Sequence, residues 1–165
     1  MTPTNTPAAT PTPTPAAGHD ARLTRIGGVA KTVRLSPGEI VTDSGSIVVE
    51  NQSAHVDTIG VYVDIVAPPS GGCTPNGRVV QMTVTLGPGA KTSIPVPVGY
   101  SCTDPVAASG LSFTWVAGAD HGADDLASCG PGALQGVTCF NALASDDEDA
   151  GDNRGSRAGP RLIAQ

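Results

Sequence analysis

The stretch SGSIVVENQSAHVDTIGVYVDIVAP, residues 44–68, decides the fold class. It contains two apolar runs joined by a short polar link. In the second run the residues Ile59, Val61, Val63 and Ile65 alternate with Gly60, Tyr62, Asp64 and Val66. Side chains on a strand point to opposite faces with a period of two, so one face of this segment is apolar and the other mostly is not. The stretch predicts a strand of a sheet that covers a core on one side.

Segments with the same character recur along the chain, separated by turn signals rich in glycine and proline. The 165 residues include 21 glycines and 15 prolines, and no segment has the pattern of an amphipathic helix. A first strand is predicted at residues 21–26, continuing through 30–35 and briefly at 40–41, and further strands are predicted at 47–50, 58–66, 78–86, 92–98, 111–117, 137–144 and 160–164. Their number and spacing predict an all-β fold, a seven- to eight-stranded immunoglobulin-like antiparallel β-sandwich.

Two of these segments carry further information about the sheet. Pro95 and Pro97 stand at alternate positions of one strand, and proline cannot donate to a ladder, so we expect an edge strand or a strand end there. The segment 111–117 is the most aromatic one. Its residues Leu111, Phe113, Trp115 and Ala117 are predicted to face the core together.

The N-terminal segment has a different composition from the rest. Residues 1–17, MTPTNTPAATPTPTPAA, hold six threonines and five prolines and no charged side chain. Proline favours extended, polyproline-like conformations that build no core. We therefore expect residues 1–18 to form a disordered Thr/Pro-rich spacer or linker, and residues 19–165 to form one domain.

The charge distribution argues against binding to nucleic acid, and the length of the apolar runs argues against membrane insertion. The net charge is −6, of which residues 19–118 carry −1 and residues 119–165 carry −5. Lysine and arginine are scattered, so there is no basic footprint for nucleic acid. No apolar run approaches the length of a transmembrane helix, and we expect no membrane insertion.

The four cysteines indicate an oxidising compartment. They are Cys73, Cys102, Cys129 and Cys139, and they lie in segments predicted as loops. An even count in such loops predicts two disulfides, and of the three pairings we favour Cys73–Cys102 with Cys129–Cys139. A zinc site would need close cysteine pairs that are absent. The expected location is extracellular or at the cell surface. Because no signal peptide is present, we expect this chain to be a fragment of a larger secreted protein.

Several short motifs resemble the CARDB family, the cell-adhesion-related domains of bacterial surface and secreted proteins. Residues 48–53 are similar to its strand and turn "V-x-N-x-G", with Ser53 in place of glycine, and residues 61–64 to its next strand. Residues 84–98 resemble its "L-x-P-G" hairpin, and residues 149–153 its acidic turn before the last strand. The resemblance implies an immunoglobulin-like module, usually in tandem copies or as an appendage, with no catalytic residues to transfer.

An acidic segment is the candidate metal site. Its oxygen donors are Asp146, Asp147, Asp149 and Asp152. Calcium takes six to eight oxygen ligands from such groups, although the spacing does not match an EF-hand. The alternative interpretation is a solvated acidic loop. Calcium is the one candidate cofactor; otherwise we expect none. A second acidic group surrounds His121, at residues 119–125, and is a weak transition-metal signal.

The enzyme signatures are incomplete. Asp43-Ser44-Gly45 resembles the aspartic protease signature, but such an enzyme needs two carboxylates, and a lone copy is more typical of a turn. The sequence has no nucleophile elbow, phosphate loop or zinc-protease motif. Asn51 begins a glycosylation sequon, which the bacterial resemblance makes incidental. We expect no catalytic activity.

Together these features predict a non-catalytic extracellular or cell-surface module for adhesion, spacing or self-assembly, including a filament or surface-structure subunit. Its partner would be another protein or a second copy, joined through an edge strand. The alternative is a carbohydrate- or ligand-binding accessory domain of a secreted enzyme. That alternative requires exposed aromatic side chains, and Tyr62 and Tyr100 are the candidates because Phe113 and Trp115 are assigned to the core.

Overall fold

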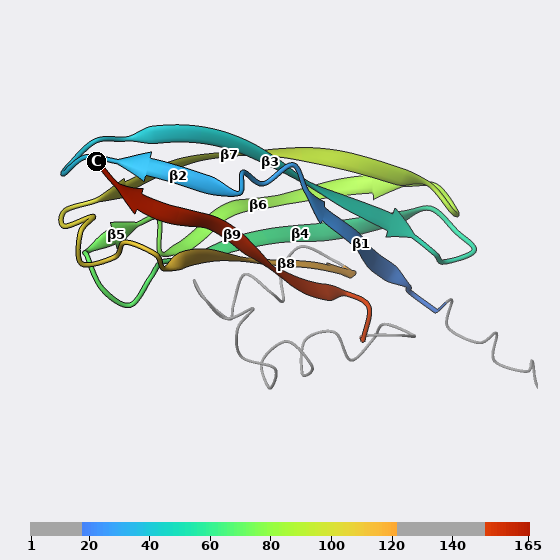
Figure 1. The fold of residues 1–165 in the computed structure, drawn as a ribbon. Coiled ribbons are helices and arrows are strands. Elements are labelled where there is room, and N and C mark those ends of the chain that lie inside the picture. The colour runs from blue at the N-terminus through green and yellow to red at the C-terminus, as the bar shows by residue number, and fades with distance from the viewer. Residues whose placement is uncertain (1–17, 122–150) are drawn as a thin grey trace, which may run out of the picture.

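The computed structural model describes residues 18–121 and 151–165, without the side chain of His121. The predicted spacer, apart from Gly18, and the predicted strand 137–144 lie outside this range. The described residues form two sheets packed face to face, drawn in Figure 1. The prediction of an all-β sandwich is confirmed.

Nine strands make up the described part of the chain. They are β1 (Ala21–Gly27), β2 (Thr32–Leu35), β3 (Val41–Asn51), β4 (Asp57–Val66), β5 (Cys73–Thr74), β6 (Gly77–Leu86), β7 (Lys91–Cys102), β8 (Ser112–His121) and β9 (Arg154–Ala164). One sheet has the order β1-β3-β7-β5 and the other the order β2-β9-β8-β4-β6. Relative to the prediction, β5 is an additional two-residue strand that pairs with the end of β7, and the predicted first strand is divided into β1 and β2, which lie in different sheets.

One pairing departs from the predicted antiparallel arrangement, because β2 runs parallel to β9. The chain leaves β1 in one sheet and enters β2 at the edge of the other sheet. Gly28 lies at this crossing with φ 68°, a left-handed conformation that glycine adopts without steric cost. A β-carbon at Gly28 would also lie 3.6 Å from the Cα of Gly45 on β3. The change of sheet therefore depends on a glycine in close contact with its neighbour.

The prediction was wrong for the segment around Asp43. Asp43-Ser44-Gly45 was expected to form a turn between two short strands, but it lies inside the continuous strand β3. The polar side chains fit a strand because β3 alternates exposed and buried positions. Asp43 also has a partner: its carboxylate accepts a hydrogen bond of 3.0 Å from the backbone N–H of Ala30.

Trp115 occupies the centre of the core and is fully buried. Its indole N–H donates to the hydroxyl of Tyr100 at 2.9 Å, and Tyr100 packs on Phe113 with ring centroids 4.6 Å apart. Two glycines make room for the indole: a β-carbon at Gly45 would lie 2.6 Å from the ring, and one at Gly159 would lie 2.9 Å from it. The predicted core positions on β8 are confirmed, except that Leu111 precedes the strand and is 39% exposed.

Burial of Tyr100 gives a pH dependence that can be measured. Removal from water raises the pKa of Tyr100 to about 12, and the hydrogen bond from Trp115 opposes this only in part. Since the unfolded chain loses the Tyr100 proton near pH 10 while the folded chain keeps it, stability should fall between pH 10 and 12 by about 1.4 kcal/mol per unit. Urea titrations of wild type and Tyr100→Phe across this range test it. Equal pH slopes for the two proteins would contradict the assignment.

The outward face of β4 and β8 is also buried, contrary to the alternating pattern predicted from the sequence. Tyr62, Asp64 and Val116 are at most 3% exposed. Arg78 on the neighbouring strand β6 accompanies two of them: its Nε lies 3.1 Å from Asp64 Oδ1, and its guanidinium lies 4.8 Å from the centroid of the Tyr62 ring. The buried carboxylate thus has a cationic partner, as a charge out of water requires.

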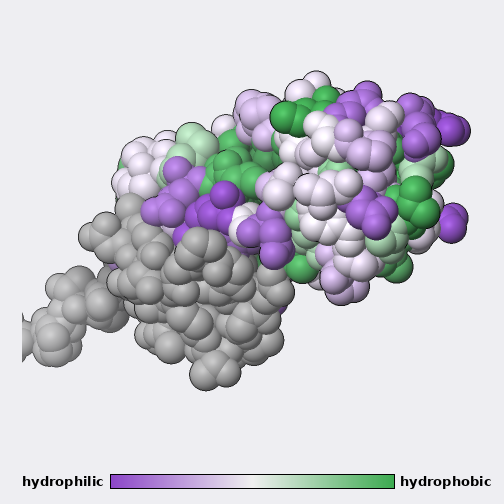
Figure 2. All heavy atoms as spheres, turned by 90° about the vertical axis from the view of Figure 1, so that its left-hand side faces the viewer, coloured by the Kyte–Doolittle hydropathy of each residue, from purple (hydrophilic) through white to green (hydrophobic). Residues whose placement is uncertain are grey.

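The described residues contain no helix long and apolar enough to cross a membrane. Figure 2 views the end of the sandwich that carries β5 and the C-terminus, and shows apolar residues in small groups among polar ones. Exposed single apolar side chains of this kind are normal on protein surfaces.

Candidate functional site

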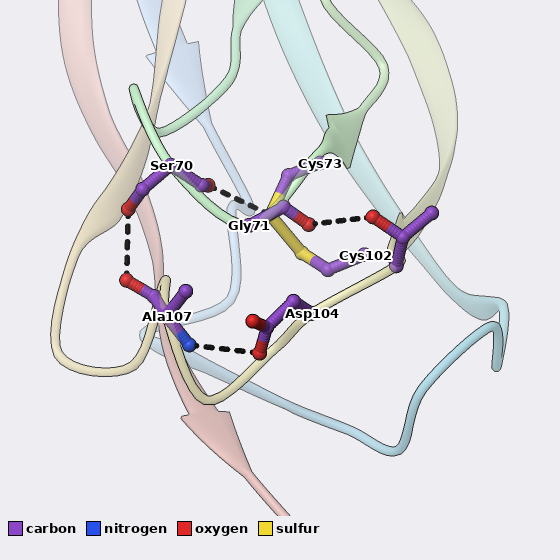
Figure 3. The surroundings of a disulfide bond; sticks show 7 residues. Ser70, Gly71, Cys73, Cys102, Asp104 and Ala107 are labelled. Atoms are coloured by element: carbon purple, nitrogen blue, oxygen red, sulfur yellow. Dashed lines mark hydrogen bonds between the residues drawn. A yellow bond between two sulfur atoms is a disulfide. The ribbon is translucent and has the colours of Figure 1, made fainter.

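One end of the sandwich is closed by the Cys73–Cys102 disulfide, which is the predicted pairing. Cys73 lies on β5 and Cys102 ends β7, so the bridge joins two paired strands rather than two loops. Figure 3 shows how the surrounding loops are tied together: the Ser70 hydroxyl donates to the carbonyl of Ala107 at 2.8 Å, and the N–H of Ala107 donates to Asp104 at 3.0 Å. The disulfide and these hydrogen bonds hold the loops at this end of the sandwich together. Cys129 and Cys139 lie outside the described residues.

The other end of the sandwich brings together three metal-ligating side chains, His19, His55 and Asp57. One donor atom from each lies within 4.8 Å of the other two. His19 Nδ1 is 3.0 Å from Asp57 Oδ2, and the two imidazole rings pack edge to face with centroids 5.1 Å apart. The Asp57 side chain is 2% exposed, and His19 is 28% exposed. We call these three residues the His19 cluster.

A buried asparagine shapes the turn that carries two of the three residues. The Asn51 amide donates to the carbonyls of His55 at 2.8 Å and Leu86 at 2.9 Å, and its oxygen accepts hydrogen bonds from the N–H and hydroxyl of Ser53. These contacts curl the chain between β3 and β4. Because Asn51 is fully buried and its amide donates to two carbonyls, the sequon is not accessible to glycosylation in the folded domain.

The third residue, His19, is held against this turn by the chain entering β1. The N–H of Gln52 donates to the carbonyl of Asp20 at 2.8 Å. On the other side Asp57 is oriented by the N–H of Thr58, which donates to Oδ1 at 2.8 Å and leaves Oδ2 facing His19. Sequence reasoning missed this cluster because 36 positions separate His19 from His55. The cluster could have been found from the sequence only by predicting that the start of the chain lies against the turn after β3.

The acidic residues predicted as a calcium site are only partly described. Asp146, Asp147 and Asp149 lie outside the described residues. Asp152 is described, and its carboxylate lies 3.2 Å from the Nε of Arg22. The described part of the chain thus shows Asp152 in an ion pair, while the calcium site stays a prediction.

The two tyrosines predicted as candidates for a carbohydrate platform do not form one. Tyr62 is 1% exposed and Tyr100 is fully buried. Tyr62 lies under Arg78, and Tyr100 is hydrogen-bonded to Trp115 in the core. Phe113 and Trp115 are core residues as predicted, so no aromatic side chain in the described ranges is exposed to stack on a sugar.

The sheet edges differ in how well they are protected against pairing. On β7 the exposed prolines Pro95 and Pro97 pair, among the described residues, only with β3, because β5 reaches no further than Ser101, so this stretch is an edge as predicted. On β1 there is a bulge between Leu23 and Arg25, and the Leu23 N–H already donates to the carbonyl of Asp152. The strand β2 is only four residues long. Short length, bulges and prolines are the usual means of blocking edge pairing.

The edge strand β6 is protected only at its start, where Arg78 adds a charge and the register shift against β4 marks a bulge at Val79. It is ten residues long, and residues 79–86 contain no proline and no charge. Among the described residues it pairs only with β4. On the face that continues the core, Met82 is 43% exposed, between the partly buried Val80 and Val84. Gln81, Thr83 and Thr85 are exposed on the other face.

No protein-family model matches the sequence, and no curated protein matches it. Among solved structures, a CARDB domain from Pyrococcus furiosus in complex with di-metal ions is similar over 92% of this chain and 98% of that chain, with 10% identity and a TM-score of 0.47. A chain of the complex between zinc 2-glycoprotein and prolactin inducible protein from human seminal plasma is similar over 87% and 95%, with 14% identity and a TM-score of 0.35. A β-glucosidase from Kluyveromyces marxianus has 8% identity and a TM-score of 0.37, and the match spans only 14% of that enzyme. A CARDB domain, the family that the sequence motifs resemble, is one of the solved structures found.

Proposed function

We propose that this chain is a non-catalytic extracellular domain for adhesion or spacing, which joins to a second copy of itself through the edge strand β6. The observation that carries the proposal is the contrast between the edges. In the described part of the chain, the edge at β1, the edge at β2 and the exposed stretch of β7 each bear a feature that prevents pairing, whereas β6 offers residues 80–86 without one. An unprotected edge of this length is a template for strand addition.

A second copy is the occupant that fits this edge. Antiparallel pairing of two β6 strands about Met82 sets Met82 opposite its equivalent and Val80 opposite Val84 of the other copy. A two-fold axis perpendicular to the sheet keeps the core-facing sides of both copies on the same side, so the half-exposed apolar row becomes continuous. The edge is uncharged from residue 79 to 86, and so no like charges oppose each other. Such a pairing closes at two copies and builds no filament.

The extracellular location is supported by the Cys73–Cys102 disulfide, because disulfides persist in oxidising compartments. Adhesion or spacing is supported by the position of the domain after a Thr/Pro-rich segment, since such a composition favours extended spacers. The alternative of a carbohydrate-binding domain has less support, because the described aromatic side chains are buried.

The substitution Met82→Lys tests the self-association. It places two lysines opposite each other in the paired edge and removes an apolar contact. We expect the dimerisation constant to weaken by about tenfold or more, which corresponds to ~1.4 kcal/mol. The measurement is size-exclusion chromatography with light scattering of the oxidised chain over a wide range of concentrations.

Ser93→Lys is the matched control. Ser93 is exposed on β7, on the edge that the prolines protect, and the change adds the same charge. We expect its association to equal that of the wild type. A wild type that stays monomeric at every concentration, or a Ser93→Lys protein that is weakened as much as Met82→Lys, would refute the proposed interface.

A further inference from the structure

We propose that the His19 cluster binds one divalent transition-metal ion, with zinc as the expected occupant. The three ligands are His19 before β1, His55 in the turn after β3, and Asp57 at the start of β4.

The geometry is close to what zinc requires. Ligands about 2.0–2.1 Å from a four-coordinate zinc ion lie roughly 3.3 Å from one another. His19 Nδ1 and Asp57 Oδ2 are joined by a hydrogen bond of 3.0 Å, and zinc would take the place of its proton, with the two atoms as one edge of the tetrahedron. All three donors lie within 4.8 Å of one another, so binding would require the donors that are farthest apart to approach by at most about 1.5 Å. The fourth position would be left to water.

The polar atoms of the cluster supply a second argument. His55 Nε2 is buried and has no hydrogen-bond partner among the described residues. A buried polar atom without a partner costs free energy, which a metal ion at this atom would recover. The edge-to-face contact between the rings of His55 and His19 does not offset this cost, because it is a contact between rings and not a hydrogen bond.

The donor types select the metal. Two imidazole nitrogens and one carboxylate suit zinc and its transition-metal neighbours, whereas calcium takes oxygen ligands. The ligands are also held in place before the metal arrives, by the Gln52 to Asp20 hydrogen bond and by the Thr58 N–H on Asp57. A bound ion would tie the start of β1 to the turn between β3 and β4, and would fix the point where the N-terminal segment enters the domain.

The test is calorimetric titration of the full oxidised chain, stripped of metal with a chelator, with zinc chloride. We expect one ion per chain at this site. The substitutions His55→Ala and Asp57→Asn should each weaken binding by roughly 100-fold or more, because even residues behind the ligands contribute about 10- to 100-fold. Cobalt should give the visible absorption of a tetrahedral site in the wild type and lose it in both variants. Calcium chloride should not compete.

His55→Ala leaves the turn intact, because Asn51 and Ser53 bind the carbonyl of His55 and not its ring. Asp104→Asn is the matched control for Asp57→Asn: it makes the same chemical change beside the disulfide, at the far end of β7, and should bind zinc like the wild type. Zinc binding that survives both His55→Ala and Asp57→Asn would place the ion elsewhere and overturn the proposal. A wild type that binds neither zinc nor cobalt would overturn it too.

Discussion

Replacing Trp115 by alanine should lower the free energy of unfolding by about 3–5 kcal/mol. The side chain is fully buried between Gly45 of β3 and Gly159 of β9, and thus touches both sheets. Its removal leaves a cavity that neither glycine can fill, and it takes away the donor to the Tyr100 hydroxyl. Domains of this size have total stabilities of about 5–15 kcal/mol, so the loss is a large part of the whole.

Urea titration followed by far-ultraviolet circular dichroism measures this effect, since Trp115 is the only tryptophan and its fluorescence is lost in the variant. Gly45→Ala is the complementary change. Its β-carbon would lie 2.6 Å from the indole ring, and overpacking of this kind costs about 1–3 kcal/mol. Val106→Ala, at a position 71% exposed, is the control and should change stability by less than about 0.5 kcal/mol. A Trp115→Ala protein as stable as this control would refute the assigned core.

Replacing Cys73 and Cys102 together by serine should lower the free energy of unfolding by about 3–4 kcal/mol. The bridge closes a segment of sequence separation 29, and a cross-link of that length restricts the unfolded chain by about this amount. Both cysteines are also buried, at 7% and 1% exposure, so the serine hydroxyls enter an apolar site. The loops that Figure 3 shows around the bridge should then open first.

The measurement is a denaturant titration of the double-serine protein against the wild type, both without reductant. The single variants are unsuitable, since each leaves an unpaired thiol. A comparison of wild type with and without reductant is the control for the serine side chains, although it also reduces any bridge between the other two cysteines. An unchanged midpoint and slope for the double-serine protein would show that the bridge does not stabilise the fold.

Much of this architecture could be predicted from local patterns. The alternation in residues 59–66 predicted a strand, and β4 lies there. Pro95 and Pro97 predicted an edge because a missing N–H prevents pairing whatever the surrounding fold. Phe113 and Trp115 were assigned to the core from alternation in an aromatic strand, and both are fully buried. These features depend on neighbours in sequence, which is why the sequence alone sufficed.

Other features were decided by the tertiary structure. The same alternation predicted that Tyr62 and Asp64 would face solvent, but both are buried, because a strand pattern says nothing of what covers the outward face. Asp43-Ser44-Gly45 was expected in a turn from its local composition, yet it pairs with β7 along its whole length, Asp43 with Val98 and Gly45 with Val96. Long-range pairing outweighed the local turn preference.

The candidate metal centre shows the same division. The sequence by itself determined most of the strands, the core face of β8 and the proline-blocked edge, since each follows from residue type and local spacing. The Cys73–Cys102 pairing was predicted from the expected order of strands, although the structure places the two cysteines on paired strands. Only the tertiary structure brought His19 to His55 and Asp57, because that contact requires the start of the chain to lie against the turn after β3. Contacts across 36 to 38 positions arise from the order of strands in a sheet, and that order is set by the packing of the whole domain.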